Sequence, residues 1–164
     1  MAASDLVLFA EDLTEIEATL TRLQRESNSR FVALIDRNGQ QVSMVGQTRG
    51  LDATSLASLA AGNVAATEGL AQLLGESAFT SLYHEGERDS LHMTPVGRRV
   101  IMLIAFDEHS SLGLVRLRVR HALPILQKIF EGIDQRAAER RAGAGGGAPF
   151  AEITDADIDS LFAE

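Results

Sequence analysis

The run VIMLIAF, residues Val100 to Phe106, constrains the fold of this chain more than any other segment. Successive side chains of a β-strand point to opposite faces of the sheet, so a strand that is apolar at every position needs both faces covered. The run is too short to cross a membrane as a helix, which takes about 20 residues. We therefore predict a central strand, in a sheet with one layer above it and one below.

The segments around this strand predict helices and further strands. Apolar residues recur at helical spacing over 8–24 and from 110 to about 141, where Pro124 is expected to kink the helix. The dipeptide Asn38-Gly39 separates two apolar runs and predicts a hairpin over 31–45. Other strands are predicted at 79–84, 90–94 and 99–106, with 95–97 as a turn. Together with one more helix, this order predicts an α/β (α+β) fold: a three-layer α-β-α sandwich with a five-stranded antiparallel sheet.

That helix is predicted over Leu51–Gly75, with a cap at Asp52 or Thr54 and an end at Gly75, and it has two opposed faces. One face carries the leucines Leu56, Leu59, Leu70 and Leu74. The other carries the small residues Ala57, Ala61, Ala65 and Gly69, with Ser58 and Gly62 beside them. We expect the leucines to face the core, and the small residues to let another backbone come close. The helix therefore favours a binding protein over an enzyme.

The composition excludes several classes of function. The chain has no cysteine, and its four histidines lack the spacing of metal ligands, so we expect no metal site and no cofactor. The pattern G-x-x-x-x-G-K-[ST] does not occur, so the chain has no Walker loop for a nucleotide. A net charge of −8 leaves no basic field for nucleic acid or an anionic membrane. The first residues lack the basic and apolar regions of a signal peptide, which favours a cytoplasmic protein.

Glycine and charge divide the chain into a domain over 1–141, a Gly/Ala-rich linker over 142–149 and a C-terminal segment over 150–164. The stretch 142–164 carries five carboxylates and no lysine or arginine. Its large apolar residues are Phe150, Ile153, Ile158, Leu161 and Phe162. The segment is either an acidic tail that aids solubility or a short helix that forms on contact with a partner, and we favour the helix.

Five stretches of the chain carry a resemblance to a known family. They are LIDRNGQQVS, SLASLAAGNVAATEGLAQLLGE, YHEGERDSLHMTPVGRRVIMLIAFD, SSLGLVRLRV and PFAEITDADIDSLF. Together they resemble the MglB branch of the roadblock/LC7 family, from about Leu8 to the end of the chain. The small-residue helix and the C-terminal stretch are specific to this branch. The sheet alone would indicate only a roadblock or longin-like domain.

The resemblance implies a homodimer whose sheet continues across both subunits, with the two central helices side by side. It implies that the dimer binds one GTP-loaded MglA, a Ras-like GTPase of bacterial cell polarity and motility, and accelerates GTP hydrolysis. MglB-like proteins do so without an arginine finger, by moving the GTPase's own catalytic residues into place, so we expect no catalytic residue in this chain. The C-terminal segment is expected to reach the GTPase and modulate nucleotide exchange, and the protein is expected to concentrate at a cell pole.

The resemblance assigns the partner face to the small-residue stripe, of which Ala65 and Gly69 are the strongest candidates. The alternative for the stripe is helix packing within the homodimer, and both can hold. Arg98 and Arg99 could imitate an arginine finger, but we expect them at an exposed strand start. Two other functions stay open. One is a roadblock scaffold that docks a GTPase or motor component without changing hydrolysis. The other is a sensor-type domain with a ligand between sheet and helix, against which the apolar VIMLIAF strand argues.

Overall fold

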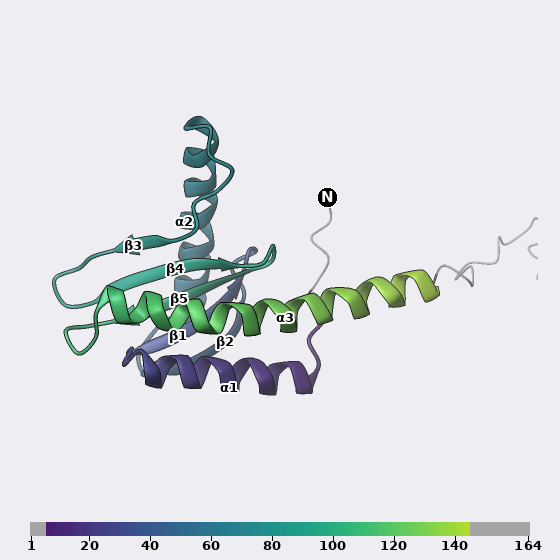
Figure 1. Ribbon diagram of the computed structural model, residues 1–164, viewed down its shortest axis with the longest axis horizontal. Coiled ribbons are helices and arrows are strands. Elements are labelled where there is room, and N and C mark those ends of the chain that lie inside the picture. Colours follow the sequence, from purple (N-terminus) through teal and green to yellow (C-terminus); the bar gives the residue numbers. More distant parts are fainter. Residues whose placement is uncertain (1–5, 145–164) are drawn as a thin grey trace, which may run out of the picture.

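The computed structural model describes residues 6–144, which form one sheet and three helices (Figure 1). In chain order the elements are α1 (Ala10–Glu26), β1 (Phe31–Asp36), β2 (Gln41–Gly46), α2 (Ala53–Leu73), β3 (Leu82–His84), β4 (Ser90–Val96), β5 (Val100–Phe106) and α3 (Leu112–Ala144). The C-terminal segment 150–164, with its five apolar residues, lies outside the described residues.

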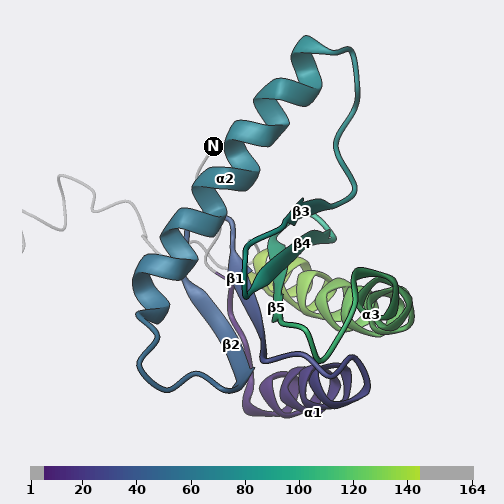
Figure 2. The same cartoon turned by 90° about the vertical axis from the view of Figure 1, so that its left-hand side faces the viewer.

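The sheet confirms the arrangement predicted from the VIMLIAF run. All its neighbouring strands are antiparallel, in the order β2-β1-β5-β4-β3, so β5 is central, and every residue of β5 is buried. Helices α1 and α3 lie side by side on one face, and α2 crosses the other (Figures 1 and 2). Alternate β5 residues serve the two cores: Met102 and Ile104 pack toward α1 and α3, and Ile101 and Leu103 pack toward α2.

The predicted hairpin forms, and its turn brings the chain against α2. The Asp36 carboxylate accepts hydrogen bonds from the backbone N–H groups of Asn38 and Gln40, at 2.9 and 2.8 Å. Gly39 has a φ of +84°, and a Cβ placed there would lie 3.0 Å from Cα of Ser58 in α2. Glycine is therefore required at position 39 both by the backbone conformation and by the contact with α2.

Two strand boundaries differ from the prediction. β3 is only three residues long, so the residues at 79–81 are not part of the sheet. Pro95 lies inside β4 opposite Ile101, and the turn falls at 97–99 instead. β3 pairs with β4 only as far as Met93, which leaves the side of β4 away from β5 open at Pro95. A residue without an N–H is tolerated at such an unpaired strand edge.

His92 is a buried ionisable side chain on the face of β4 that α3 covers. It stands opposite Ile104, it is 2% exposed, and among the described residues its Nδ1 atom has no hydrogen-bond partner. Burial first, and then the positive charge of Arg116, lower the pKa of His92 from 6.5 to about 4. The ring is therefore neutral in the folded chain near pH 7.

Mild acid should destabilise the fold through His92. The unfolded chain takes up a proton there near pH 6.5, whereas the folded chain does so only near pH 4, so stability should fall as the pH drops through this window. The expected loss is on the order of 3 kcal/mol. Urea unfolding at the two ends of this window should show this loss in the wild type and much less of it in His92→Leu.

His109 provides the control for this experiment. It is exposed, and its hydrogen bond to the Asp107 carboxylate raises its pKa, so any stability that it adds is present at low pH and lost as the pH rises. His109→Gln should therefore leave the acid-induced loss in place or steepen it. An equal loss in His92→Leu and in the wild type would contradict the assignment to His92.

Candidate functional site

Helix α2 is covered by the rest of the described chain over only part of its length. Its N-terminal half packs on the sheet, and its C-terminal half projects beyond the sheet (Figures 1 and 2). The helix begins where predicted, because the Asp52 carboxylate accepts hydrogen bonds from the backbone N–H and the hydroxyl of Ser55, at 3.0 and 2.6 Å. These hydrogen bonds lower the pKa of Asp52. After the helix, Gly75 has a φ of +76°, which agrees with the predicted end.

The prediction that the leucines of α2 face the core is wrong. Leu59 is 74% exposed and Leu73 is 84% exposed, and Leu70 and Leu74 are exposed as well. Only Leu56 packs in part against the core. The α2 residues buried in the core beneath the helix are Ala57, Ala60, Ala61 and Val64, and Ala71 is buried nearer the C-terminal end of the helix. Small side chains let the helix axis come close to the sheet, and that close packing leaves the leucines outside.

The small-residue stripe is therefore divided between the core and the surface. Ala57 and Ala61 are buried against the sheet, whereas Gly62, Ala65 and Gly69 are exposed. A Cβ added at Gly62 or Gly69 would meet nothing within 4 Å. Glycine inside a helix costs about 1 kcal/mol relative to alanine. Packing within this chain therefore gives no reason for either glycine.

Contacts of α2 distinguish two flanks of the helix. On one flank Ser58 touches the hairpin at Gly39, and Glu68 forms an ion pair with Arg37 of the same hairpin. This flank also carries Gly62, Ala65 and Gly69, and we call it the glycine flank. On the opposite flank Asn63 hydrogen-bonds to His84 of β3, at 3.3 Å. The exposed leucines Leu59 and Leu70 lie on this side, which we call the leucine flank.

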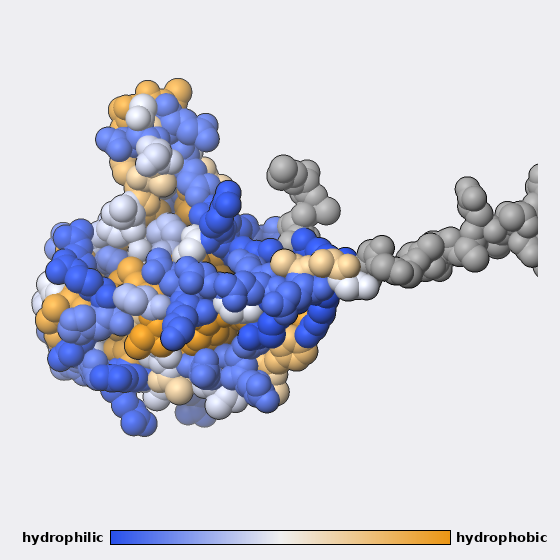
Figure 3. Space-filling view, turned by 45° about the vertical axis from the view of Figure 1, so that its right-hand side comes forward, coloured by the Kyte–Doolittle hydropathy of each residue, from blue (hydrophilic) through white to orange (hydrophobic). Residues whose placement is uncertain are grey.

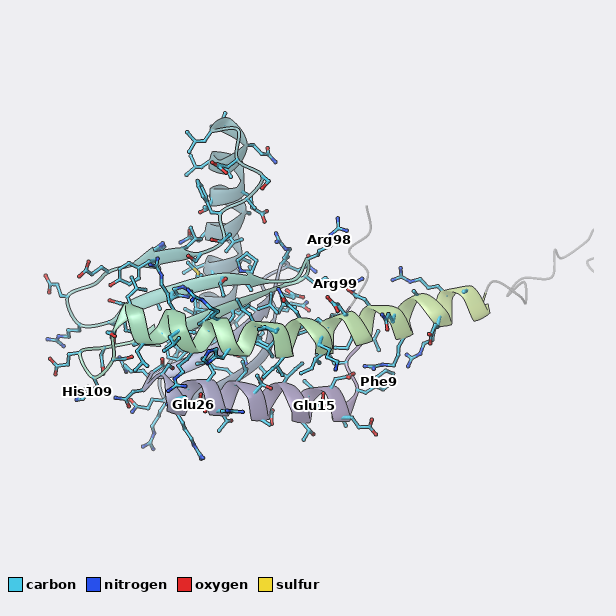
Figure 4. The ribbon with its side chains drawn as sticks, in the orientation of Figure 1. Phe9, Glu15, Glu26, Arg98, Arg99 and His109 are labelled. Carbon is cyan, nitrogen blue, oxygen red and sulfur yellow. The ribbon has the colours of Figure 1, made fainter. Side chains whose placement is uncertain are left out.

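The arginines considered as a finger lie in the turn between β4 and β5 (Figure 4). Arg98 is exposed, as predicted. Arg99 forms an ion pair with Asp134 of α3, with 3.0 Å between Nε and Oδ1. The turn lies beside the first hairpin, because the backbone N–H of Arg37 donates to the carbonyl of Arg99. Arg99 thus helps to hold the sheet to α3.

Within residues 6–144 no group of histidine, aspartate or glutamate side chains is arranged to hold a metal ion. No helix in that part of the chain is both long and apolar enough to cross a membrane. The two flanks of α2 are therefore taken as the candidate site for a partner.

The chain matches the model of the roadblock/LC7 domain over residues 15–106 and belongs to the roadblock/LC7 family. Within that family it is similar to MglB of Myxococcus xanthus, with 52% identity and a TM-score of 0.74 over 78% of this chain and 96% of that one. The gliding protein MglB of Thermus thermophilus is 34% identical, with a TM-score of 0.74 over 80% of this chain and 99% of that one. A structure described as MglB with a tetrameric arrangement is 32% identical, with a TM-score of 0.75 and the same coverage. No curated protein gives a significant match.

The burial of the alanine face can be tested by enlarging one residue on each side of α2. Ala57→Leu should destabilise the fold by about 1–3 kcal/mol, because the added atoms have no space beneath the helix. Ala66→Leu, at an exposed position of the same helix, should change stability by less than about 0.5 kcal/mol. Chemical denaturation of the two variants makes the comparison. Equal effects would mean that the alanine face is not the packed face.

Proposed function

We propose that this chain is a GTPase-activating protein for an MglA-type small Ras-like GTPase that controls bacterial cell polarity and motility. The observation that carries the proposal is the 52% identity to Myxococcus xanthus MglB over nearly the whole length of that protein. The glycine flank supports it independently, because it is an exposed surface that lets another backbone approach. On this proposal the chain is a regulator of hydrolysis and not itself an enzyme.

The active unit of the proposal is a homodimer. The leucine flank supports a second copy as its occupant, because exposed leucines there adjoin β3, the edge strand of the sheet. Pairing of β3 with its counterpart continues the sheet across the two subunits. It also places the two α2 helices side by side, with their leucines between them.

The GTP-bound GTPase then docks on the glycine flanks. Residues Ala65 and Gly69 are its proposed contacts, with Gly62 beside them. Ala57 and Ala61 do not contact the GTPase directly. They are buried under α2, and their small size determines how far the helix stands above the sheet. Close backbone contact at this surface moves the GTPase's own catalytic residues into place, so no arginine finger is needed. Arg99 forms its ion pair with Asp134 on the side of the sheet opposite α2.

The remaining parts of the proposal concern the ends of the chain and its place in the cell. Residues 1–141 form the regulatory domain, 142–149 link it to the C-terminal segment, and 150–164 modulate nucleotide exchange on the GTPase. The protein works in the cytoplasm and concentrates at a cell pole. The alternative is a scaffold that docks the same GTPase, or a motor component, through the same flank without accelerating hydrolysis.

The proposed dimer interface can be tested by substitutions that should change the oligomeric state. Leu59→Asp combined with Leu70→Asp should convert the dimer into a monomer that keeps its helical circular dichroism, because both side chains are exposed within one chain. Light scattering after size-exclusion chromatography measures the mass. Leu117→Asp, at an exposed leucine of α3, is the matched control and should remain dimeric. A dimer that survives the double substitution would place the interface elsewhere.

Phosphate release by the MglA-type GTPase, with and without this chain, tests the function itself. The wild-type chain should accelerate release. Ala65→Arg combined with Gly69→Arg should abolish both acceleration and binding while the fold is kept, because neither position packs within the chain. Gly113→Arg combined with Ala138→Arg, at exposed positions of α3, should act like the wild type. Binding without acceleration by the wild type would establish the scaffold.

A further inference from the structure

A groove follows the seam between α1 and α3, on the face of the sheet opposite α2. It has a volume of about 760 Å³, and its floor includes Pro124, Ile125 and Ile129 of α3. Ile125 is 46% exposed although it lies between two helices. A second hollow of about 280 Å³ shares Thr19 and Ile125 with the first, so the groove continues along the seam. Figure 3 shows hydrophobic side chains at this seam, bordered by hydrophilic ones.

The rim of the groove carries an excess of positive charge, although the chain as a whole has a net charge of −8. Its four cations are Arg22, Arg118, Lys128 and Arg136, and its three carboxylates are Asp12, Glu15 and Glu26. Glu26 forms ion pairs with Arg22 and with Arg118, and Asp12 forms one with Arg136. Lys128 has no ion pair within the described residues. The rim is therefore suited to an occupant that is apolar on one side and acidic on the other.

We propose that the groove between α1 and α3 is the docking site of this chain's own C-terminal segment, residues 150–164. The segment carries five carboxylates and no basic residue, together with Ile158, Leu161 and Phe162. These apolar side chains pack at the end of the groove that Ile129 and Gly132 line, and the carboxylates face Lys128 and Arg136 of the rim. While it is docked, the segment is withheld from any partner.

The length of the chain allows this return. From Gly132, at the groove, to Ala144, where the description ends, α3 rises by about 18 Å. The five residues 145–149 span at most about 17 Å, and helix–helix connections of this length are common. A helix over residues 150–162 is about 20 Å long. Folded back antiparallel to α3, it brings Leu161 and Phe162 to the groove.

Because the segment is covalently attached to the domain, even weak contacts with the groove are sufficient to keep it docked for part of the time. A short Gly/Ala-rich linker holds the segment at an effective concentration of the order of 1 mM near its site. A groove that binds the free segment with a Kd of about 1 mM would therefore be occupied about half of the time. The proposal needs no large interface and no GTPase.

Paramagnetic NMR on the full chain tests the docking directly. The chain has no cysteine, so Ala163→Cys offers a single attachment point for a nitroxide spin label. With the segment docked about half of the time, the amide signals of Ala18 and Lys128 should lose about half of their intensity or more. Those of Thr54 and Arg88, which lie away from the seam, should keep theirs. Equal intensities at all four positions, or losses away from the seam, would overturn the proposal.

Two further samples identify the cause of the effect. Lys128→Glu should restore most of the intensity at Ala18, whereas Arg88→Glu, an exposed arginine in the loop between β3 and β4, should not. A mixture of two kinds of chain isolates contacts between copies: isotope-labelled chains without the nitroxide, which give the NMR signals, and chains without the isotope label that carry the nitroxide. Losses that persist in that mixture would show that the groove takes the segment of another copy and would overturn docking within one chain. No GTPase is present, so either failure leaves the proposed function untouched.

Discussion

The close packing of the alanine face of α2 on the sheet determines what the rest of the molecule presents. Ala57, Ala60 and Ala61 are small enough to bring the helix close to β1 and β2, and they leave no space there for a leucine. The leucines therefore lie outside, and the C-terminal half of the helix has no sheet beneath it (Figure 2). Exposure of both flanks of α2 follows from this single contact.

The two faces of the sheet are built differently, and the difference matches their proposed roles. The face under α1 and α3 is filled by large side chains, among them Ile16, Leu20, Leu126 and Phe130, and it contains most of the core. The face under α2 is filled mainly by alanine and by the strand residues themselves. Hydrophobic stabilisation scales with buried apolar area, so the packing of α1 and α3 on the sheet contributes most of the stability, and much of α2 remains exposed. A substitution at an exposed position of α2 can therefore change binding without unfolding the domain.

The sequence predicted the features that local chemistry decides. The VIMLIAF run, the Asn38-Gly39 turn, the Asp52 cap and the end at Gly75 each depend on a few neighbouring residues, and each is confirmed. The orientation of α2 depends on which of its two apolar faces packs better on the sheet. The periodicity of the sequence placed the leucines in the core, whereas the structure buries the smaller alanines there. The short β3 and the position of Pro95 depend on where strand pairing ends. The groove between α1 and α3 depends on the spacing of two helices, which the pattern of a single helix does not contain.

The glycines of α2 connect this packing to function. Gly62 and Gly69 each cost helix stability, and each lies on open surface where alanine would fit. Gly39, by contrast, is required by its turn and by its contact with Ser58. No contact within the described chain accounts for the two glycines of α2. The proposed function assigns a role to the exposed glycines of α2: they let the backbone of the GTPase come close to the helix.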